Sequence, residues 1–137
     1  MPIQEETEGV IVKIPIDEGW HTYGRLVDGY VAVYDCRTKE AIADMKEIIL
    51  KPVLFIIGAH RDVITSGRWP KVGKVPAGAP KIPIPDQYIF DNPQKCRIVD
   101  KHWYDKRIAT PEECEGLEVA AIWDGHHAEK RLRDYYA

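Results

Sequence analysis

Residues 20–35 read WHTYGRLVDGYVAVYD, and this stretch decides the fold because a tight turn divides it into two strand patterns. Before the turn, residues 20–27 alternate between two sets of side chains, and after it residues 30–35 are rich in Val and Tyr. Asp28-Gly29 stands between them, and these residue types adopt the positive φ angles of a type I′ turn at low cost. The stretch therefore predicts a β-hairpin.

A further strand is predicted upstream, at residues 9–16, which read GVIVKIPI. Alternate residues are apolar and fall on one face, while Pro15 takes a position that an edge strand tolerates. The residues Asp-Glu-Gly at 17–19 form the turn into the next strand. Three consecutive strands joined by tight turns make an antiparallel meander. Its apolar face consists of Val10, Val12, Ile14 and Ile16.

Downstream of the meander the apolar spacing changes. Residues 40–50, EAIADMKEIIL, carry apolar side chains every three to four positions, which predicts a short helix near 40–48. VLFIIGAH from residue 53 is a continuous apolar run, and we interpret it as a strand that ends at Gly58 and is buried on both faces at the centre of the core. Two further strands are expected at 87–91 and 96–100, with a turn between them.

The C-terminal part contains clear helix signals. Residues 110–113, Thr-Pro-Glu-Glu, have the form of a capping box with proline at the first helical position, which predicts a short helix at 111–115. LEVAAIW at 117–123 is another strand candidate. Asp124 is a candidate N-cap for a closing helix at 125–135.

These elements indicate an α+β fold that is rich in β-structure. With 137 residues and 45% hydrophobic side chains, the chain suits one domain with a single core, so we expect one domain over residues 1–137. The expected architecture is a strongly bent antiparallel sheet or a partly open small barrel from residues 9 to 100. Short helices and the C-terminal helix complete it.

Composition limits the classes of partner. The formal net charge of −3 gives no overall attraction to nucleic acid and suits a basic partner better. Three cysteines far apart argue against a disulfide framework. The sequence contains no apolar run of about eighteen residues, and the start MPIQEETEG is acidic where a signal peptide is basic. We therefore expect a cytoplasmic protein without membrane contact.

Residues 67–74, GRWPKVGK, place a tryptophan among turn-forming residues and cations, and a phosphate-binding loop is the first hypothesis to test. The Walker pattern needs four residues between its glycines and a hydroxyl side chain after the lysine. Here five residues separate Gly67 from Gly73, and Val75 follows Lys74. The spacing excludes this hypothesis.

Metal binding and catalysis have little support in the sequence. His126 and His127 are adjacent, and adjacent helical residues point about 100° apart, so a shared ion would need ligands from elsewhere. Cys36 and Ser66 lack the surroundings of a nucleophile, and no G-x-S-x-G elbow is present. We expect no metal, no cofactor and no enzymatic activity.

Protein binding and nucleic-acid binding remain as alternatives. Trp, Tyr and Arg supply most interface energy, and loops rich in Gly and Pro hold them at low entropic cost. The same chain as a small barrel could instead bind nucleic acid, with Tyr23, Arg25, Tyr30, Arg68 and Trp69 as the residues that stack on bases and contact phosphates. Trp69 could equally be a core residue. The candidate partner-binding residues are Tyr23, Arg25, His60, Arg61, Arg68, Trp69 and Lys71.

Five segments occur in a characteristic order: GxIVKIPI, YGRLV, VLFIIGAHRDVITSGRWPKVGKVP, ATPEECEGLExAAIWD and EKRL. Together they resemble the bacterial immunity protein 26 family of polymorphic toxin systems, and the similarity spans nearly the whole chain. Each piece is short, so the specificity lies in their order. The pieces that carry the resemblance are Ile14-Pro15, Tyr23-Gly24-Arg25, Phe55, Gly67-Arg68-Trp69 and Gly73-Lys74.

The resemblance implies a mixed, β-rich fold and an antitoxin role. Proteins of this kind bind and block a cognate secreted toxin inside the producing cell, and the family brings no catalytic residues to transfer to this chain. Its toxin partners vary, so the resemblance names neither the toxin nor an oligomeric state. Since the chain is acidic, a basic nuclease toxin would fit it by charge.

Overall fold

A computed structural model describes residues 7–137, which form two compact units. The first comprises the described residues up to Ile82 together with Ile122–Ala137, and the second comprises Pro83–Ala121. Most of the acidic N-terminal stretch lies outside the described residues. One domain over residues 1–137 stays a prediction.

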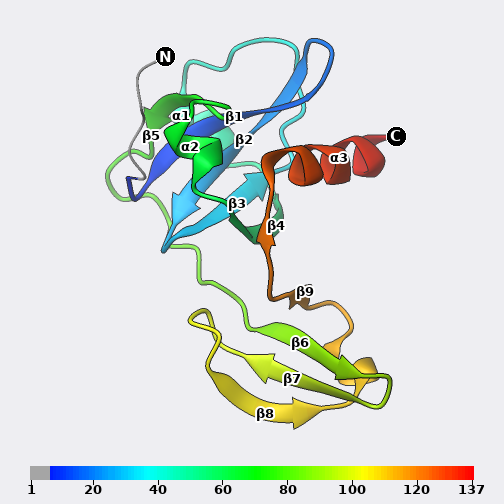
Figure 1. Cartoon of the computed structure of the whole chain (residues 1–137). Coiled ribbons are helices and arrows are strands. Elements are labelled where there is room, and N and C mark those ends of the chain that lie inside the picture. The colour runs from blue at the N-terminus through cyan, green and yellow to red at the C-terminus, as the bar shows by residue number, and fades with distance from the viewer. Residues whose placement is uncertain (1–6) are drawn as a thin grey trace. The chain divides into compact units, whose positions relative to one another are not determined.

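The first unit is built on a six-stranded sheet with the order β10-β4-β3-β2-β1-β5 (Figure 1). The predicted meander of β1, β2 and β3 is confirmed, and its tight turn has positive φ at Asp28 and Gly29. Neighbouring strands are antiparallel except β10 and β4, which are parallel. The strands are β1 (Val10–Asp17), β2 (Trp20–Val27), β3 (Tyr30–Tyr34), β4 (Val53–Ala59), β5 (Lys71–Lys74) and β10 (Ile122–Trp123).

Both faces of this sheet are covered, which gives the unit two apolar clusters. On one face the predicted apolar side of β1 packs with residues from α2 (Asp62–Thr65) and α3 (Gly125–Tyr136). On the other face Ile11 packs with residues around α1 (Met45–Ile49). Two-sided cover explains why β2 and β3 are buried almost throughout.

The position of the core corrects one sequence-based expectation. We expected the run from residue 53 to be buried on both faces at the centre of the core. In the structure β4 lies next to the short edge strand β10, and Val53 at its start is exposed. The central strands are β2 and β3. Their mixture of apolar and polar residues hides this burial in the sequence, since Thr22 Oγ1 and Arg25 Nη1 are buried with hydrogen bonds to backbone carbonyls.

The second unit is a four-stranded sheet with the order β8-β7-β6-β9 (Figure 1). It contains the two strands that we expected near 87–91 and 96–100, and adds β8, which the sequence analysis missed. The expected strand at 117–123 is wrong as one element, because it divides into β9 and β10 in different sheets. The strands are β6 (Gln87–Asn92), β7 (Lys95–Val99), β8 (Asp105–Ala109) and β9 (Glu118–Val119).

The helix predictions hold in type, with differences in detail. The capping box is confirmed: Glu113 N–H donates to Thr110 Oγ1 at 3.4 Å, and Thr110 N–H donates to Glu113 Oε1 at 3.0 Å, at the start of the 3₁₀ helix η1 (Pro111–Cys114). Helix α1 begins at Met45, later than expected. Asp124 stands at the N-cap of α3, but its side chain makes no capping hydrogen bond.

The fold is therefore α+β and rich in strands, with open sheets among residues 7–137 and a C-terminal helix, as the sequence predicts. Over the same residues, no helix has the length and the apolar character that crossing a bilayer would require.

Gly24 in β2 offers a test of the packing at the centre of the sheet. A Cβ atom there would lie 2.7 Å from Val31 Cγ1 and 2.9 Å from Ile14 Cδ1, both in the core. We expect Gly24→Ala to lower the free energy of unfolding by about 1–3 kcal/mol through overpacking, measured by urea denaturation. If the clash with Val31 is the cause, adding Val31→Ala to the Gly24→Ala variant lowers the free energy of unfolding by less than Val31→Ala lowers it in the wild-type chain.

Candidate functional site

The segment GRWP, residues 67–70, forms a corner between α2 and β5. Gly67 has φ of +82°, and its N–H donates to the Ile64 carbonyl at 3.1 Å, which ends α2. Trp69 N–H then donates to the Val63 carbonyl at 2.8 Å and fixes the backbone of the corner. The corner sends the indole of Trp69 into the core between the sheet and the helices.

Trp69 is a core residue, which settles the question that the sequence left open. Its side chain is 0% exposed and belongs to the apolar cluster that includes Val63, Ile64 and Leu132. An indole in this position fills the space between α2 and α3 and is inaccessible to a partner. Its one polar group still needs a hydrogen-bond acceptor.

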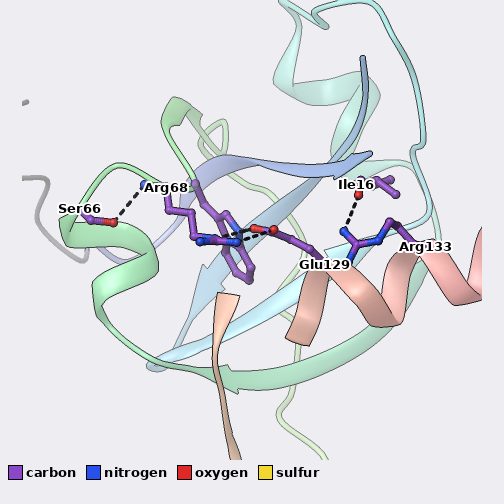
Figure 2. Close-up of polar contacts among 6 residues, drawn as sticks. Ile16, Ser66, Arg68, Glu129 and Arg133 are labelled. Carbon is purple, nitrogen blue, oxygen red and sulfur yellow. Dashed lines mark hydrogen bonds and ion pairs between the residues drawn. The ribbon is translucent and has the colours of Figure 1, made fainter. Parts of the chain in front are cut away.

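Glu129 on α3 supplies that acceptor and joins three side chains into one network. Trp69 Nε1 donates to Glu129 Oε2 at 2.9 Å, while Arg68 Nε and Nη2 donate to Oε2 and Oε1, both at 2.8 Å. Figure 2 shows the guanidinium of Arg68 facing the carboxylate. A Cβ on Gly125 would lie 2.7 Å from Arg68 Nε, so the glycine leaves room for this pair. The network ties α3 to the corner.

The electrostatics of the network follow from its geometry. Burial by itself would raise the pKa of the Glu129 carboxyl, but the hydrogen bonds from Arg68 and Trp69 outweigh it and hold this pKa below its ordinary value. The hydrogen bond to Glu129 raises the pKa of Arg68. The Arg68 side chain is 46% exposed, so water screens part of the attraction.

Two more contacts hold the rest of α3 on the first unit. Arg133 Nη1 donates to the Ile16 carbonyl at 2.9 Å (Figure 2), and Tyr136 Oη donates to Asp35 Oδ1 at 2.6 Å. Burial, with the hydrogen bond to Asp35, raises the pKa of Tyr136. The helix is thus attached near its start, middle and end.

Tyr23 and Arg25 also lie in the interior. Tyr23 Oη accepts the Ile42 N–H at 2.9 Å, and Arg25 Nη1 donates to the Pro80 carbonyl at 2.9 Å. Both side chains are buried and hold the two long loops of the unit against the sheet. They do not offer surface to a partner.

The other four candidates are accessible but do not form one patch. His60 and Arg61 follow β4, where His60 Nδ1 lies 3.1 Å from Asp62 Oδ1, whereas Lys71 begins β5 at the opposite edge of the sheet. Arg68 borders a hollow of about 390 Å³ together with Asp62 and residues at the start of α3. Partner contact by these four residues stays a prediction.

A group of possible metal ligands lies at the start of α3. Ligand atoms of Asp124, His126 and His127 all lie within 4.8 Å of one another, because Asp124 precedes the helix and the centroids of the two imidazole rings, tilted by 45°, are 4.0 Å apart. The adjacency argument from the sequence missed this arrangement. A cation here would meet the positive end of the helix and the neighbouring Arg68, and both are unfavourable to it.

Comparison with known proteins identifies the family. The profile described as immunity protein 26 matches residues 7–99, which is more than half of the chain. The chain belongs to the immunity protein 26 family. No curated protein and no solved structure matches it. The match includes the meander, the GRWP corner and β5, so the immunity protein 26 profile describes the sheet into which Trp69 packs.

Two features of this immunity protein 26 member escaped the sequence analysis. The first is the burial of Glu129, which its residue type does not indicate, since a carboxylate on a polar helix resembles any solvated residue. Its spacing from Ala128 and Leu132, which share the buried side of α3, could have indicated burial. The exposed aromatic and aliphatic residues of the second unit were also missed. They are Phe90, Trp103, Tyr104 and Ile108.

The buried indole gives a direct test of the corner. We expect Trp69→Ala to lower the free energy of unfolding by about 3–5 kcal/mol, because it removes the buried indole and leaves a cavity in the core. Trp69→Phe should cost about 1–2 kcal/mol, mainly for the lost hydrogen bond to Glu129. Thermal melting measures both, and the exposed Tyr135→Ala serves as the control that stays near wild type. An unchanged melting temperature for Trp69→Ala would contradict a core position.

The lowered pKa of Glu129 predicts a pH dependence. Because the folded-state pKa lies below the ordinary 4.5, the carboxylate stabilises the fold fully above that pH, and this contribution is lost as the pH falls through the folded-state value. Glu129→Gln cannot titrate, so its difference from wild type should be largest at neutral pH and shrink towards pH 3. The measurement is urea denaturation across this range, and a constant difference would count against the network.

Proposed function

We propose that this chain is an immunity protein that binds a cognate protein toxin in the cytoplasm and neutralises it without catalysis. Membership of the immunity protein 26 family is the observation that carries the proposal. Binding that covers the toxin's active surface is sufficient for neutralisation, so no reacting group is needed on the inhibitor.

The state of the candidate nucleophiles supports a role without catalysis. Cys36 and Cys114 are buried, and burial raises the pKa of both thiols, which disfavours the reactive thiolate. Ser66 follows the last residue of α2, and its hydroxyl donates a hydrogen bond to the carbonyl of Asp62 in the first turn, so the hydroxyl takes part in ending the helix. Both thiols lie in apolar clusters and the hydroxyl takes part in the end of α2, so these groups serve the fold.

The nucleic-acid alternative loses four of its five candidate residues, since only Arg68 is exposed. Tyr23, Tyr30 and Trp69 were the candidates for base stacking, and all three are buried. Arg25 is buried as well and donates to a backbone carbonyl. With an acidic chain as well, a protein partner fits better than a phosphate backbone.

Co-expression tests the proposal. The toxin domain encoded by the neighbouring gene is expressed in a bacterial host with and without this chain. We expect the toxin alone to stop growth and the pair to restore it, with both proteins recovered as one complex in a pull-down. Growth arrest that this chain leaves unchanged would contradict the proposal.

Non-catalytic action has its own measurement. The toxin is separated from the complex by denaturation, refolded and assayed, and its intact mass is determined. Simple binding predicts an unchanged mass and recovered toxicity, whereas a covalent change in the toxin would mean that the chain acts as an enzyme.

A further inference from the structure

The sheet of the second unit has one face with a small apolar core, the covered face, and an opposite face, the open face, on which Gln87 and Val99 are buried but Ile89, Arg97 and Ile108 reach solvent. The covered face carries the small apolar cluster of Cys96, Ile98, Ala109 and Cys114, with Leu117 packed against it. On the opposite face Ile89, Arg97 and Ile108 stand in register across β6, β7 and β8. Ile108 is 67% exposed, an unusual position for a large aliphatic side chain on a strand.

The turn between β7 and β8 adds two aromatic side chains beside this open face. Trp103 Nε1 donates to Gln87 Oε1 at 3.2 Å, and Gln87 shares the open face by alternation along β6. Tyr104, the next residue, is 69% exposed. Trp103 and Tyr104 thus add exposed aromatic surface at the turn that leads into β8, the strand that carries Ile108.

Hydrogen bonds hold this turn in one conformation. Asp100 Oδ1 accepts hydrogen bonds from the N–H groups of His102 at 2.9 Å and of Tyr104 at 3.0 Å. These bonds keep the pKa of Asp100 below its ordinary value, and the bond from Tyr104 has the larger effect. Trp103 has a φ of +65°, which a bulky residue adopts only where its surroundings fix it. A rigid aromatic turn loses little entropy on binding, as is typical of residues that dominate interfaces.

The charge of the protein is concentrated in the same unit. Residues 83–121 contain eight acidic and five basic side chains, a formal charge of −3, while the rest of the chain contains fourteen of each. Three of the five cations of the unit form ion pairs within it: Arg97 pairs with Asp91 and Asp105, Lys106 with Asp86, and Arg107 with Glu113. A partner therefore approaches an acidic unit.

From these observations we propose that the open face of the second unit, defined by Ile89, Arg97, Trp103, Tyr104 and Ile108, is the docking surface for the toxin. The matching surface of the toxin is basic and has an apolar centre. This inference rests on the proposed function and names the part of the chain that performs it.

Matched substitutions test the surface in the full chain. Tyr104→Ala and Ile108→Ala should each weaken the affinity for the toxin domain of the neighbouring gene about tenfold or more, measured by calorimetry. Tyr135→Ala and Leu50→Ala remove side chains of similar size that are 58% and 83% exposed on the first unit, and should change the affinity less than about twofold. Arg61→Glu tests whether the toxin binds instead at His60 and Arg61, which follow β4, and on the present proposal it leaves the affinity nearly unchanged.

Charge is tested separately through the association rate. For a basic partner, the wild-type rate should fall about tenfold between low and high salt. Glu112→Lys with Glu115→Lys reverses the sign of the unit's charge and should slow association, whereas Glu18→Lys with Glu40→Lys makes the same change on the first unit and should slow it less. All four glutamates are exposed, and thermal melting checks that each variant folds.

The outcomes separate this inference from the proposed function. A wild-type chain that does not bind the toxin contradicts both. A second outcome is that wild type, Tyr104→Ala and Ile108→Ala bind the toxin equally well, whereas Arg61→Glu does not bind it. In that case the chain is an immunity protein, but its docking surface is not the open face. The open face could instead bind a second copy of this chain, and sedimentation measures this. If Tyr104→Ala or Ile108→Ala converts a dimer to a monomer and leaves toxin binding intact, the inference is also overturned.

Discussion

The carboxylate of Glu129 is the contact on which the arrangement of the first unit depends. It accepts hydrogen bonds from Trp69 and from both arms of the Arg68 fork, so one buried group joins a corner of the chain to a helix about sixty positions later. A buried charge is unfavourable unless it is paired and hydrogen-bonded, and here both conditions are met. Without it the indole donor would lie unsatisfied in the core, and α3 would lose its attachment to the corner.

The six-stranded sheet gives that network its setting. Because helices cover one face and long loops with α1 cover the other, β2 and β3 are buried almost throughout, together with polar groups that they carry. Tyr23 Oη and Arg25 Nη1 are satisfied by the backbone of the covering loops. Residues whose chemistry suits an interface are therefore used to close the fold, which leaves partner binding to other parts of the surface.

The two units differ in the kind of surface that they present. The first is electrically balanced and buries the tryptophan of its most distinctive sequence, GRWP, in its core. The second carries the excess negative charge, a thin apolar core and rigid aromatic side chains in water. Membership of the immunity protein 26 family and the chemistry of the open face thus point to the same function.

The sequence by itself determined the local elements, because turn chemistry and periodicity are local: the Asp28-Gly29 hairpin, the capping box at Thr110 and the C-terminal helix. It also carried the family through the order of short motifs. It could not place Trp69 inside or outside, show that β4 lies near an edge, or find Glu129. Those depend on pairing between distant segments, where burial comes from what packs on each face. Only the tertiary structure turned a candidate binding segment into the corner that Glu129 holds.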